Sequence, residues 1–251
     1  MEFKHAVFVD KPSGISTKDC LYKILKIYKI RFAGYTGILD PKVSGMVLFL
    51  LDDARKAMPL LMGLNKTYEG IMYLHSDVEK KRVEEVCKKF EGKIKQIPPA
   101  RSRVARKERE RDIMSLDIEK IEGRNVWMKV QCEAGTYIRK LMHDIGQDLG
   151  CGAHMKFLRR TAISGFSEMV KLEELEKNPE KYLASLEDVL EKVGIKKVFV
   201  EKEDLEKIKH GQPLEKQVKE DGQIGIYFEN QIIALGTAQK DKIKIDRVFK
   251  F

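Results

Sequence analysis

The stretch GYTGILDPKVSG (Gly34–Gly45) places one carboxylate, Asp40, in a glycine-rich loop directly before Pro41. A residue before proline is disfavoured in the α region and adopts an extended conformation. The glycines of the stretch allow backbone conformations that other residues resist. Such a loop can present a single carboxylate to a ligand, and aspartate before proline is also ordinary turn chemistry. The stretch by itself therefore leaves both a functional loop and a simple turn open.

The segments on either side of this loop predict a fold of mixed helices and strands. Short apolar runs predict strands at Ala6–Val9, Met46–Leu51, Tyr68–Leu74, Ile113–Ile121 and Val126–Cys132. Apolar residues at helical spacing predict a helix capped by Ser16 or Thr17 and helices at Asp52–Met62, Asp77–Phe90, Thr136–Leu149 and Leu172–Val193, the last interrupted near Pro179. Because strands and helices do not alternate regularly, this order indicates an α+β fold.

Gly194 marks a predicted domain boundary, so we expect one domain over residues 1–194 and a second over residues 195–251. Beyond the boundary the sequence predicts a strand at Lys197–Val200, a short helix at Glu203–Lys209 and strands at Ile224–Phe228, Ile232–Leu235 and Ile243–Phe249. The short turns between these segments indicate a small, β-rich, barrel-like module, which lies at the lower end of usual domain sizes.

Basic residues outnumber acidic ones: 48 lysines and arginines against 39 aspartates and glutamates, a formal net charge of +9 over 251 residues. A surplus of this size favours a polyanionic partner, which is bound through phosphate contacts and counterion release. The alternative is a generally charged surface with abundant Lys and Glu, as in thermophilic proteins.

The positive charge is concentrated in two runs. The first, Gln96–Asp112, combines Pro98 and Pro99 with a dense basic series, and the second is Gly152–Thr161. From these runs we expect RNA backbone contacts by Arg101, Arg103, Arg106, Lys107, Arg159 and Arg160. Since the first run is too charged for a core strand and its prolines oppose a helix, we expect a flexible loop against a phosphate backbone, with a solvated charged face as the alternative.

The chain lacks the usual sequence marks of metal, cofactor or membrane binding. Its four cysteines form no CxxC pair and are far apart, which favours buried free thiols in a reducing compartment over a zinc site or a disulfide framework. No P-loop or dinucleotide fingerprint is present. No signal peptide and no apolar run of the roughly 20 residues of a membrane span is visible. We therefore expect a cytoplasmic protein with no metal, no cofactor and no membrane partner.

Several polar and aromatic residues could pair with a carboxylate or stack on a nucleobase. Arg139, at the start of a predicted helix, can form a charge-assisted pair with Asp40 that orients the carboxylate, although a surface arginine is the simpler explanation. Tyr35, Tyr68 and Tyr137 can each stack on an unstacked nucleobase, although packing in the core is the commoner role of such residues.

Five motifs occur in order through the first two thirds of the chain: DKPSGIST (Asp10–Thr17), GYTGILDPKVSG (Gly34–Gly45), NKTYEG (Asn65–Gly70), EAGTYIRKLMHDIG (Glu133–Gly146) and GAHMKFLRRTAISGF (Gly152–Phe166). Together they resemble the TruB/dyskerin family of pseudouridine synthases. The two basic runs are more similar to the archaeal and eukaryotic branch, the catalytic subunit of H/ACA ribonucleoproteins, than to the bacterial tRNA-modifying branch. HGQPL (His210–Leu214) and IALGTA (Ile233–Ala238) are similar to the PUA domain of that branch.

The resemblance implies roles for single residues. Asp40 would be the aspartate that breaks the uracil–ribose bond, Tyr68 would stack on the target base and move a proton, and Arg139 would pair with the aspartate. Residues implied to bind the substrate or support its loop are Tyr35, Tyr137, Leu158 and Lys11. The family usually has histidine where this chain has Tyr35, and an aromatic ring there can still stack. The segment Arg101–Arg111 would clamp the RNA.

The resemblance also implies fold and partners. We expect a central, mostly antiparallel sheet flanked by helices in the catalytic domain, followed by a short PUA-like RNA-binding domain. Guide-directed modification of rRNA, with an H/ACA guide RNA and small accessory proteins, is the leading interpretation. The alternatives are a stand-alone synthase for the T-loop uridine of tRNA and a catalytically silent RNA-binding scaffold.

Overall fold

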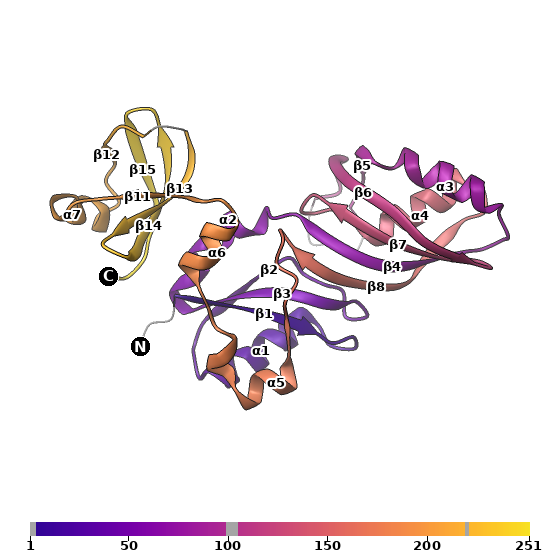
Figure 1. Ribbon diagram of the computed structural model, residues 1–251, viewed down its shortest axis with the longest axis horizontal. Coiled ribbons are helices and arrows are strands. Elements are labelled where there is room, and N and C mark those ends of the chain that lie inside the picture. Colours follow the sequence, from indigo (N-terminus) through magenta and orange to yellow (C-terminus); the bar gives the residue numbers. More distant parts are fainter. Residues whose placement is uncertain (1–3, 99–104, 219–220) are drawn as a thin grey trace.

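The apolar runs of the sequence form the centre of a ten-stranded sheet in the computed structural model, which describes residues 4–98, 105–218 and 221–251 (Figure 1). The main path of this sheet is β10 (Ala184–Ser185), β1 (His5–Lys11), β3 (Ser44–Leu51), β8 (Ala153–Ile163), β4 (Lys66–Leu74), β7 (Asn125–Cys132), β6 (Arg109–Glu122) and β5 (Gly92–Gln96). Off this path, β2 (Ala33–Thr36) pairs with β3 and β9 (Val170–Lys171) pairs with β1. The pairs β1–β9 and β3–β8 are parallel and the others antiparallel, which confirms the expected α+β fold with a mostly antiparallel sheet.

The sheet has two halves that meet at a very short joint between β3 and β8. Only two residue pairs join these strands, Ser44 with Arg159 and Gly45 with Arg160. The strands approach so closely there that a Cβ atom at position 45 would lie 2.1 Å from the carbonyl oxygen of Arg160, and Gly45 has a φ of 109°. Glycine is therefore required at this joint, which lies five residues beyond Asp40.

The first half of the sheet is buried on both faces. Val47 and Phe49 of β3 pack with Ile24 of α1 on one side, whereas Leu48 and Leu50 belong to a second core cluster on the other side. This alternation follows from the two-residue period of a strand. The helical segments around this half are α1 (Thr17–Tyr28), η1 (Asp52–Ala57), α2 (Met58–Met62), α5 (Leu172–Lys177), η2 (Pro179–Tyr182) and α6 (Leu186–Lys192).

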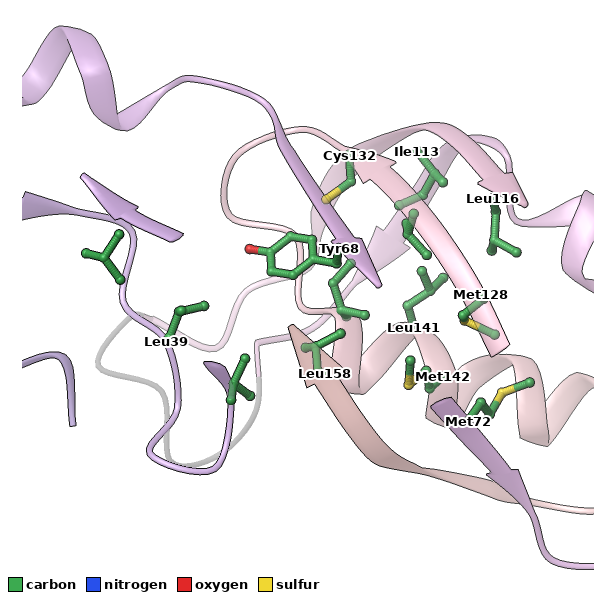
Figure 2. Packing of buried hydrophobic residues seen from close by; sticks show 14 of the residues in the cluster. Leu39, Tyr68, Met72, Ile113, Leu116, Met128, Cys132, Leu141, Met142 and Leu158 are labelled. Atoms are coloured by element: carbon green, nitrogen blue, oxygen red, sulfur yellow. The ribbon is translucent and has the colours of Figure 1, made fainter. Parts of the chain in front are cut away.

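The second half of the sheet packs one face on α3 (Lys80–Lys89) and α4 (Ile138–Asp148). Figure 2 shows Leu141 and Met142 of α4 lying among Met72 and Met128 of the sheet. At position 70 of β4 a Cβ atom would lie 2.7 Å from Met142, so Gly70 lets α4 lie close to the strand. This layer of helix on sheet supports the strands that carry the candidate site.

Residues after Gly194 form a five-stranded sheet in the order β11 (Lys196–Phe199), β13 (Gly222–Phe228), β14 (Gln231–Gln239), β15 (Lys242–Val248) and β12 (Leu214–Glu215). The segments η3 (Lys202–Asp204) and α7 (Leu205–Lys209) connect β11 to β12. This sheet has its own core around Ile226 and Ile243. It also contacts the first half of the large sheet, because Leu235 and Phe249 share the second core cluster with Leu48.

Some local predictions were wrong in detail. The helix predicted at Asp52–Met62 is a 3₁₀ segment followed by a short helix, and the region predicted as Leu172–Val193 contains the strand β10 as well as two helices. All but the first residue of the basic run Gly152–Thr161, which was not predicted as a strand, lies in β8, and β2, β5, β9 and β12 were not predicted either. No helix among the described residues is long and apolar enough to cross a membrane.

Candidate active site

Asp40 lies in the loop between β2 and β3, next to the joint of the two half-sheets. Its side chain is 47% exposed. The carbonyl oxygen of Asp40 accepts a hydrogen bond of 2.9 Å from the Val43 amide, which closes a turn through Pro41. The Pro41 carbonyl accepts a hydrogen bond of 2.8 Å from the Gly14 amide. The loop is thus held by hydrogen bonds while its carboxylate faces outward.

The structure brings Asp40 and Arg139 together, the pairing that the family resemblance implied. Arg139 Nη1 lies 2.6 Å from Asp40 Oδ2, and the Arg139 side chain, in the first turn of α4, is 49% exposed. An ion pair that is half exposed contributes little to folding stability. Its direct consequence is geometric, because it joins the loop to α4 and orients the carboxylate.

Tyr68 and Leu158 lie on neighbouring strands behind this loop. In the register of β4 and β8, Tyr68 faces Arg160 and Gly70 faces Leu158. Figure 2 shows the hydroxyl end of Tyr68 directed toward the loop that carries Leu39, with Leu158 below the ring. Tyr68 is almost fully buried, and this burial raises the pKa of its phenol, while the nearby Arg160 guanidinium opposes the rise.

Arg160 is a buried structural cation, so the prediction that it contacts an RNA backbone is wrong for the folded chain. Its side chain is 1% exposed. Its guanidinium donates hydrogen bonds of 2.6 Å to the Met46 carbonyl and 2.8 Å to the Gly37 carbonyl, and Nη1 lies 3.5 Å from the Tyr68 hydroxyl. Arg160 therefore ties the loop of Asp40 to the strand of Tyr68.

Lys11 is also buried, which corrects the prediction that it binds substrate directly. Its ammonium group donates hydrogen bonds to the carbonyl oxygens of Pro12 and Ile15, both at 2.8 Å, and of Pro41 at 3.4 Å. Burial lowers the pKa of this lysine. Lys11 thus supports the loop directly after Asp40, a supporting role that the motif itself suggested.

Arg159 precedes Arg160 in β8 and, unlike Arg160, is only partly buried. Its guanidinium forms a two-point ion pair with Asp10 of β1, with distances of 2.9 and 2.8 Å, and about a third of its side chain is exposed. A contact of Arg159 with RNA remains a prediction, and its engagement with Asp10 leaves it less free than an unpaired surface arginine.

The predicted RNA clamp is only partly within the described residues. Arg101 and Arg103 lie outside them. Arg106 and Lys107 are exposed in the segment before β6. Arg109 and Arg111 already belong to β6, so the expected flexible loop ends earlier than the charge pattern suggested. Arg111 is mostly covered and lies 3.6 Å from the Glu133 carboxylate.

Tyr35 and Tyr137 are half-buried at the margins of the site. The Tyr35 ring packs edge-on against Phe49, with the ring centroids 5.9 Å apart. The backbone of Tyr137 is held on both sides by the buried Gln96, whose amide oxygen accepts from the Tyr137 N–H at 3.0 Å and whose amide nitrogen donates to the Tyr137 carbonyl at 3.2 Å. Gln96 thereby sets the entry to α4, two residues before Arg139.

The sequence did not single out Gln96, Lys66 or the hydroxyl of Thr17, which forms hydrogen bonds with the backbone of Leu39. Gln96 comes shortly before Pro98 and Pro99, and Lys66 belongs to the motif that contains Tyr68. Neither position in the sequence shows that the side chain is buried. Lys66 is buried and donates to the carbonyl oxygens of Met62 and Leu64, and burial, followed by the nearby Arg160, lowers its pKa to about 8. No group of three or more His, Cys, Asp or Glu side chains in the described ranges is placed to hold a metal ion.

Family models match most of the chain. The model described as TruB family pseudouridylate synthase (N terminal domain) matches residues 25–138, and the model described as tRNA pseudouridylate synthase B C-terminal domain matches residues 139–194. A curated relative called Probable tRNA pseudouridine synthase B, from Archaeoglobus fulgidus, is 35% identical over 268 residues, which cover 98% of this chain and 82% of the relative. The relative of the same name from Methanopyrus kandleri is 47% identical over 165 residues, which cover 66% of this chain and 49% of the relative. With several such relatives, the chain matches about half of their length.

Solved structures show a similar fold. An H/ACA RNP bound to a substrate RNA containing 2'-deoxyuridine includes a chain with a TM-score of 0.85 and 30% identity, and the match covers 98% of this chain and 85% of that one. A chain of a Cbf5–Nop10–Gar1 complex gives a TM-score of 0.84 and 33% identity, with 98% and 84% covered.

Proposed function

The chain belongs to the TruB family of pseudouridylate synthases, and on that premise we propose that it isomerises uridine to pseudouridine in RNA. The observation that carries this proposal is the Asp40–Arg139 pair, which sits at 2.6 Å in an anchored loop beside the buried ring of Tyr68. A scaffold that only bound RNA would have no need to hold an oriented carboxylate outward at the joint of two half-sheets.

The reaction breaks the bond from ribose C1′ to uracil N1 and forms a bond from C1′ to uracil C5. A proton leaves C5 and N1 ends with a proton, so the isomerisation consumes no co-reactant. In our proposal Asp40 acts on the base or sugar as nucleophile or proton acceptor, while Arg139 holds its carboxylate in place. Tyr68 stacks on the uracil and receives or relays the proton, and Leu158 and Tyr137 line the uracil slot.

The target uridine must leave its base stack to reach Asp40, since the reacting atoms are inaccessible in stacked RNA. We place the RNA backbone along the basic segment before β6, where Arg106 and Lys107 are exposed. Exposed cations suit this role, because phosphate contacts release counterions and strengthen binding at low salt. Replacing both residues with Ala is expected to weaken RNA binding and to flatten its salt dependence, and an unchanged salt slope argues against this placement.

We propose that the RNA partner is a guide RNA within an H/ACA ribonucleoprotein and that the modified RNA is rRNA. Two similar solved chains come from an H/ACA RNP with substrate RNA and from a Cbf5–Nop10–Gar1 complex, which supports small accessory proteins as partners of this chain. The second candidate is a stand-alone tRNA synthase, favoured by the names of the curated relatives. Under both candidates, residues 195–251 would form the PUA-like RNA-binding domain.

One substitution tests the catalytic assignment. Asp40→Asn keeps the size of the side chain but removes the charge, so we expect turnover to fall by about 10⁴-fold or more while RNA affinity stays near that of the wild type. The control is Asp77→Asn, because Asp77 is also an exposed carboxylate paired with an arginine, Arg124, at 3.0 Å. Asp40→Asn with turnover close to the wild type would remove Asp40 from the mechanism.

A second experiment separates the two RNA classes. The protein is incubated with tRNA and with rRNA fragments, each with and without an H/ACA guide RNA and accessory proteins, and pseudouridine is scored by primer extension after chemical labelling. Product on rRNA that requires the guide supports the first proposal. Product on tRNA alone supports the stand-alone synthase, and no product under any condition supports an inactive scaffold.

A further inference from the structure

Ile38 is the most exposed large apolar side chain in the described part of the chain, with 67% of its surface accessible. It lies in the loop between β2 and β3, two residues before Asp40. A single exposed apolar residue on a protein surface needs no explanation. Here the position does need one, because the loop around Ile38 is among the most firmly held segments of the site.

The backbone is tied on both sides of Ile38. The Gly37 carbonyl accepts a hydrogen bond of 2.8 Å from the buried Arg160. The Leu39 amide donates to the Thr17 hydroxyl oxygen at 3.0 Å, and that hydroxyl donates to the Leu39 carbonyl at 3.1 Å. The Leu39 side chain is 4% exposed and lies in the core. Ile38 is therefore held outward by its neighbours and does not face solvent through loop disorder.

Ile38 and Asp40 are both exposed, and the residue between them is buried. Their exposed positions alternate with the buried Leu39, as expected for extended backbone. Two residues of extended chain span at most about 7 Å. The backbone of Ile38 therefore lies within about 7 Å of the backbone of Asp40, and both side chains are exposed.

Resting on the proposed function, we propose that Ile38 is an apolar wedge that enters the RNA base stack where the target uridine leaves it. Flipping a base exposes the faces of its two neighbours to water, which costs free energy. An apolar side chain inserted at that step covers these faces without hydrogen bonds, and isoleucine serves as such a wedge in other nucleic-acid complexes. The contact reads no sequence, since every base has an apolar face.

Other apolar groups near the loop fit this role less well. The Tyr35 ring is half-buried and packs against Phe49. Leu39 and Leu158 are buried in the core. Ile38 alone among these residues combines exposure, a fixed backbone and a position next to the carboxylate.

The test compares Ile38→Thr with Ile38→Val. Valine and threonine are both β-branched and have nearly the same shape as each other. Only threonine carries a hydroxyl, which opposes insertion between bases. Two RNAs that the wild type modifies are used: one with the target uridine between stacked purines, and one with abasic nucleotides on both sides of the target. We expect Ile38→Thr to lower kcat/KM about tenfold on the stacked RNA, a loss of about 1.4 kcal/mol, and to match the wild type on the abasic RNA. Ile38→Val is expected to stay within about twofold on both.

A second readout does not depend on turnover. With 2-aminopurine beside the target uridine, wild-type binding is expected to change the fluorescence of the probe as the stack opens, and Ile38→Thr is expected to give less of this change at saturating protein. Equal losses of kcat/KM on both RNAs, or no loss on either, would overturn the wedge. If the wild type forms no pseudouridine on any RNA, the proposed function itself fails, which is a separate outcome.

Discussion

At the scale of single residues, the site depends on cations that never reach the surface. Arg160, Lys11 and Lys66 are each at most 4% exposed, and each satisfies its charge with backbone carbonyl oxygens. A hydrogen bond from a charged donor to a carbonyl is worth more than a neutral one. Two of them bond the loop of Asp40, Arg160 at the Gly37 carbonyl and Lys11 at the Pro41 carbonyl, whereas Lys66 holds the turn before β4. The loop of Asp40 is thereby held on both sides of its carboxylate.

Arg160→Lys is the sharpest test of this view. A lysine has no planar fork and cannot reach the Met46 and Gly37 carbonyls together. We expect the free energy of unfolding, measured with urea, to fall by about 2–3 kcal/mol, and turnover to fall with it. Arg159→Lys is the control, because Arg159 pairs with Asp10 at a partly exposed site and its loss should be less than half as large. Equal losses from the two adjacent positions would contradict the buried role of Arg160.

Lys66 makes stability depend on pH in a predictable direction. Its pKa is about 8 in the folded chain, whereas the pKa of a lysine without burial is 10.5. Between these values the unfolded chain binds more protons than the folded one, so the contribution of this group to stability rises with pH. In Lys66→Met this rise is absent, and the stability difference between wild type and variant should shift by about 2–3 kcal/mol in favour of the wild type from pH 7 to pH 10.

The control for Lys66 is Lys81→Met, an exposed lysine on α3, for which we expect no such pH-dependent difference. Urea unfolding of all three proteins at both pH values provides the measurement. A pH-independent difference between wild type and Lys66→Met would mean that Lys66 is charged to the same extent in both states.

At the scale of elements, the first residue of α1 fixes the loop of Asp40. The helix is capped by Ser16 and Asp19 in a capping box, which leaves the Thr17 hydroxyl free to bond the backbone of Leu39. Thr17→Val keeps the shape and removes both hydrogen bonds, so we expect faster hydrogen exchange at the Leu39 amide, a stability loss of about 1–3 kcal/mol and slower turnover. Thr17→Ser should restore all three, and a valine variant with unchanged exchange would show that this contact does not hold the loop.

The joint between β3 and β8 is a second element-scale feature. Gly45→Ala would place a methyl group 2.1 Å from the Arg160 carbonyl, which only separation of the strands can relieve. We expect a loss of more than about 4 kcal/mol. Gly14→Ala is the matched control, since Gly14 also has a positive φ of 98° but open space around the new methyl group. Its loss should be about 1–2 kcal/mol, and equal losses would show that backbone strain, not the close approach, makes glycine necessary at the joint.

At the scale of the whole molecule, the two sheets share a core. Phe249, 1% exposed, belongs to the same cluster as Leu48 and Leu50 of β3. Hydrogen bonds also join the two parts of the chain. Lys56 donates to the Val248 carbonyl at 2.7 Å, and the Lys250 amide donates to Asp53 at 2.8 Å. The five-stranded sheet therefore covers a face of the large sheet as well as forming its own core.

This contact predicts that both sheets unfold together. In Phe249→Ala we expect the free energy of unfolding to fall by about 3–5 kcal/mol, within one cooperative transition seen by circular dichroism and by tryptophan fluorescence. Trp127 of β7 reports on the large sheet alone. Phe199→Ala, at an exposed position of β11, should change stability little. Two separate transitions in the wild type would show that the sheets fold independently.

Much of the element pattern could be predicted because its causes are local. The capping residues before α1, the continuous apolar run of β3 and the two-residue period of β4 each depend on neighbours within a few positions. Predictions failed where many charged residues hid the two-residue alternation of a strand. The run Gly152–Thr161 was interpreted by its basic residues, although most of it lies in β8, and Arg109 and Arg111 were assigned to a loop for the same reason.

For the candidate site, the sequence by itself determined that Asp40 stands in a glycine-rich loop before a proline, and its motifs indicated Arg139 and Tyr68 as partners. Only the tertiary structure decided which neighbouring cation faces inward. Arg159 and Arg160 are identical in chemistry and adjacent in β8, yet one pairs with Asp10 at a partly exposed edge and the other is buried behind the loop. Successive residues of a strand face opposite sides, and which side becomes the interior depends on β3 and β4, which are distant from β8 in the chain.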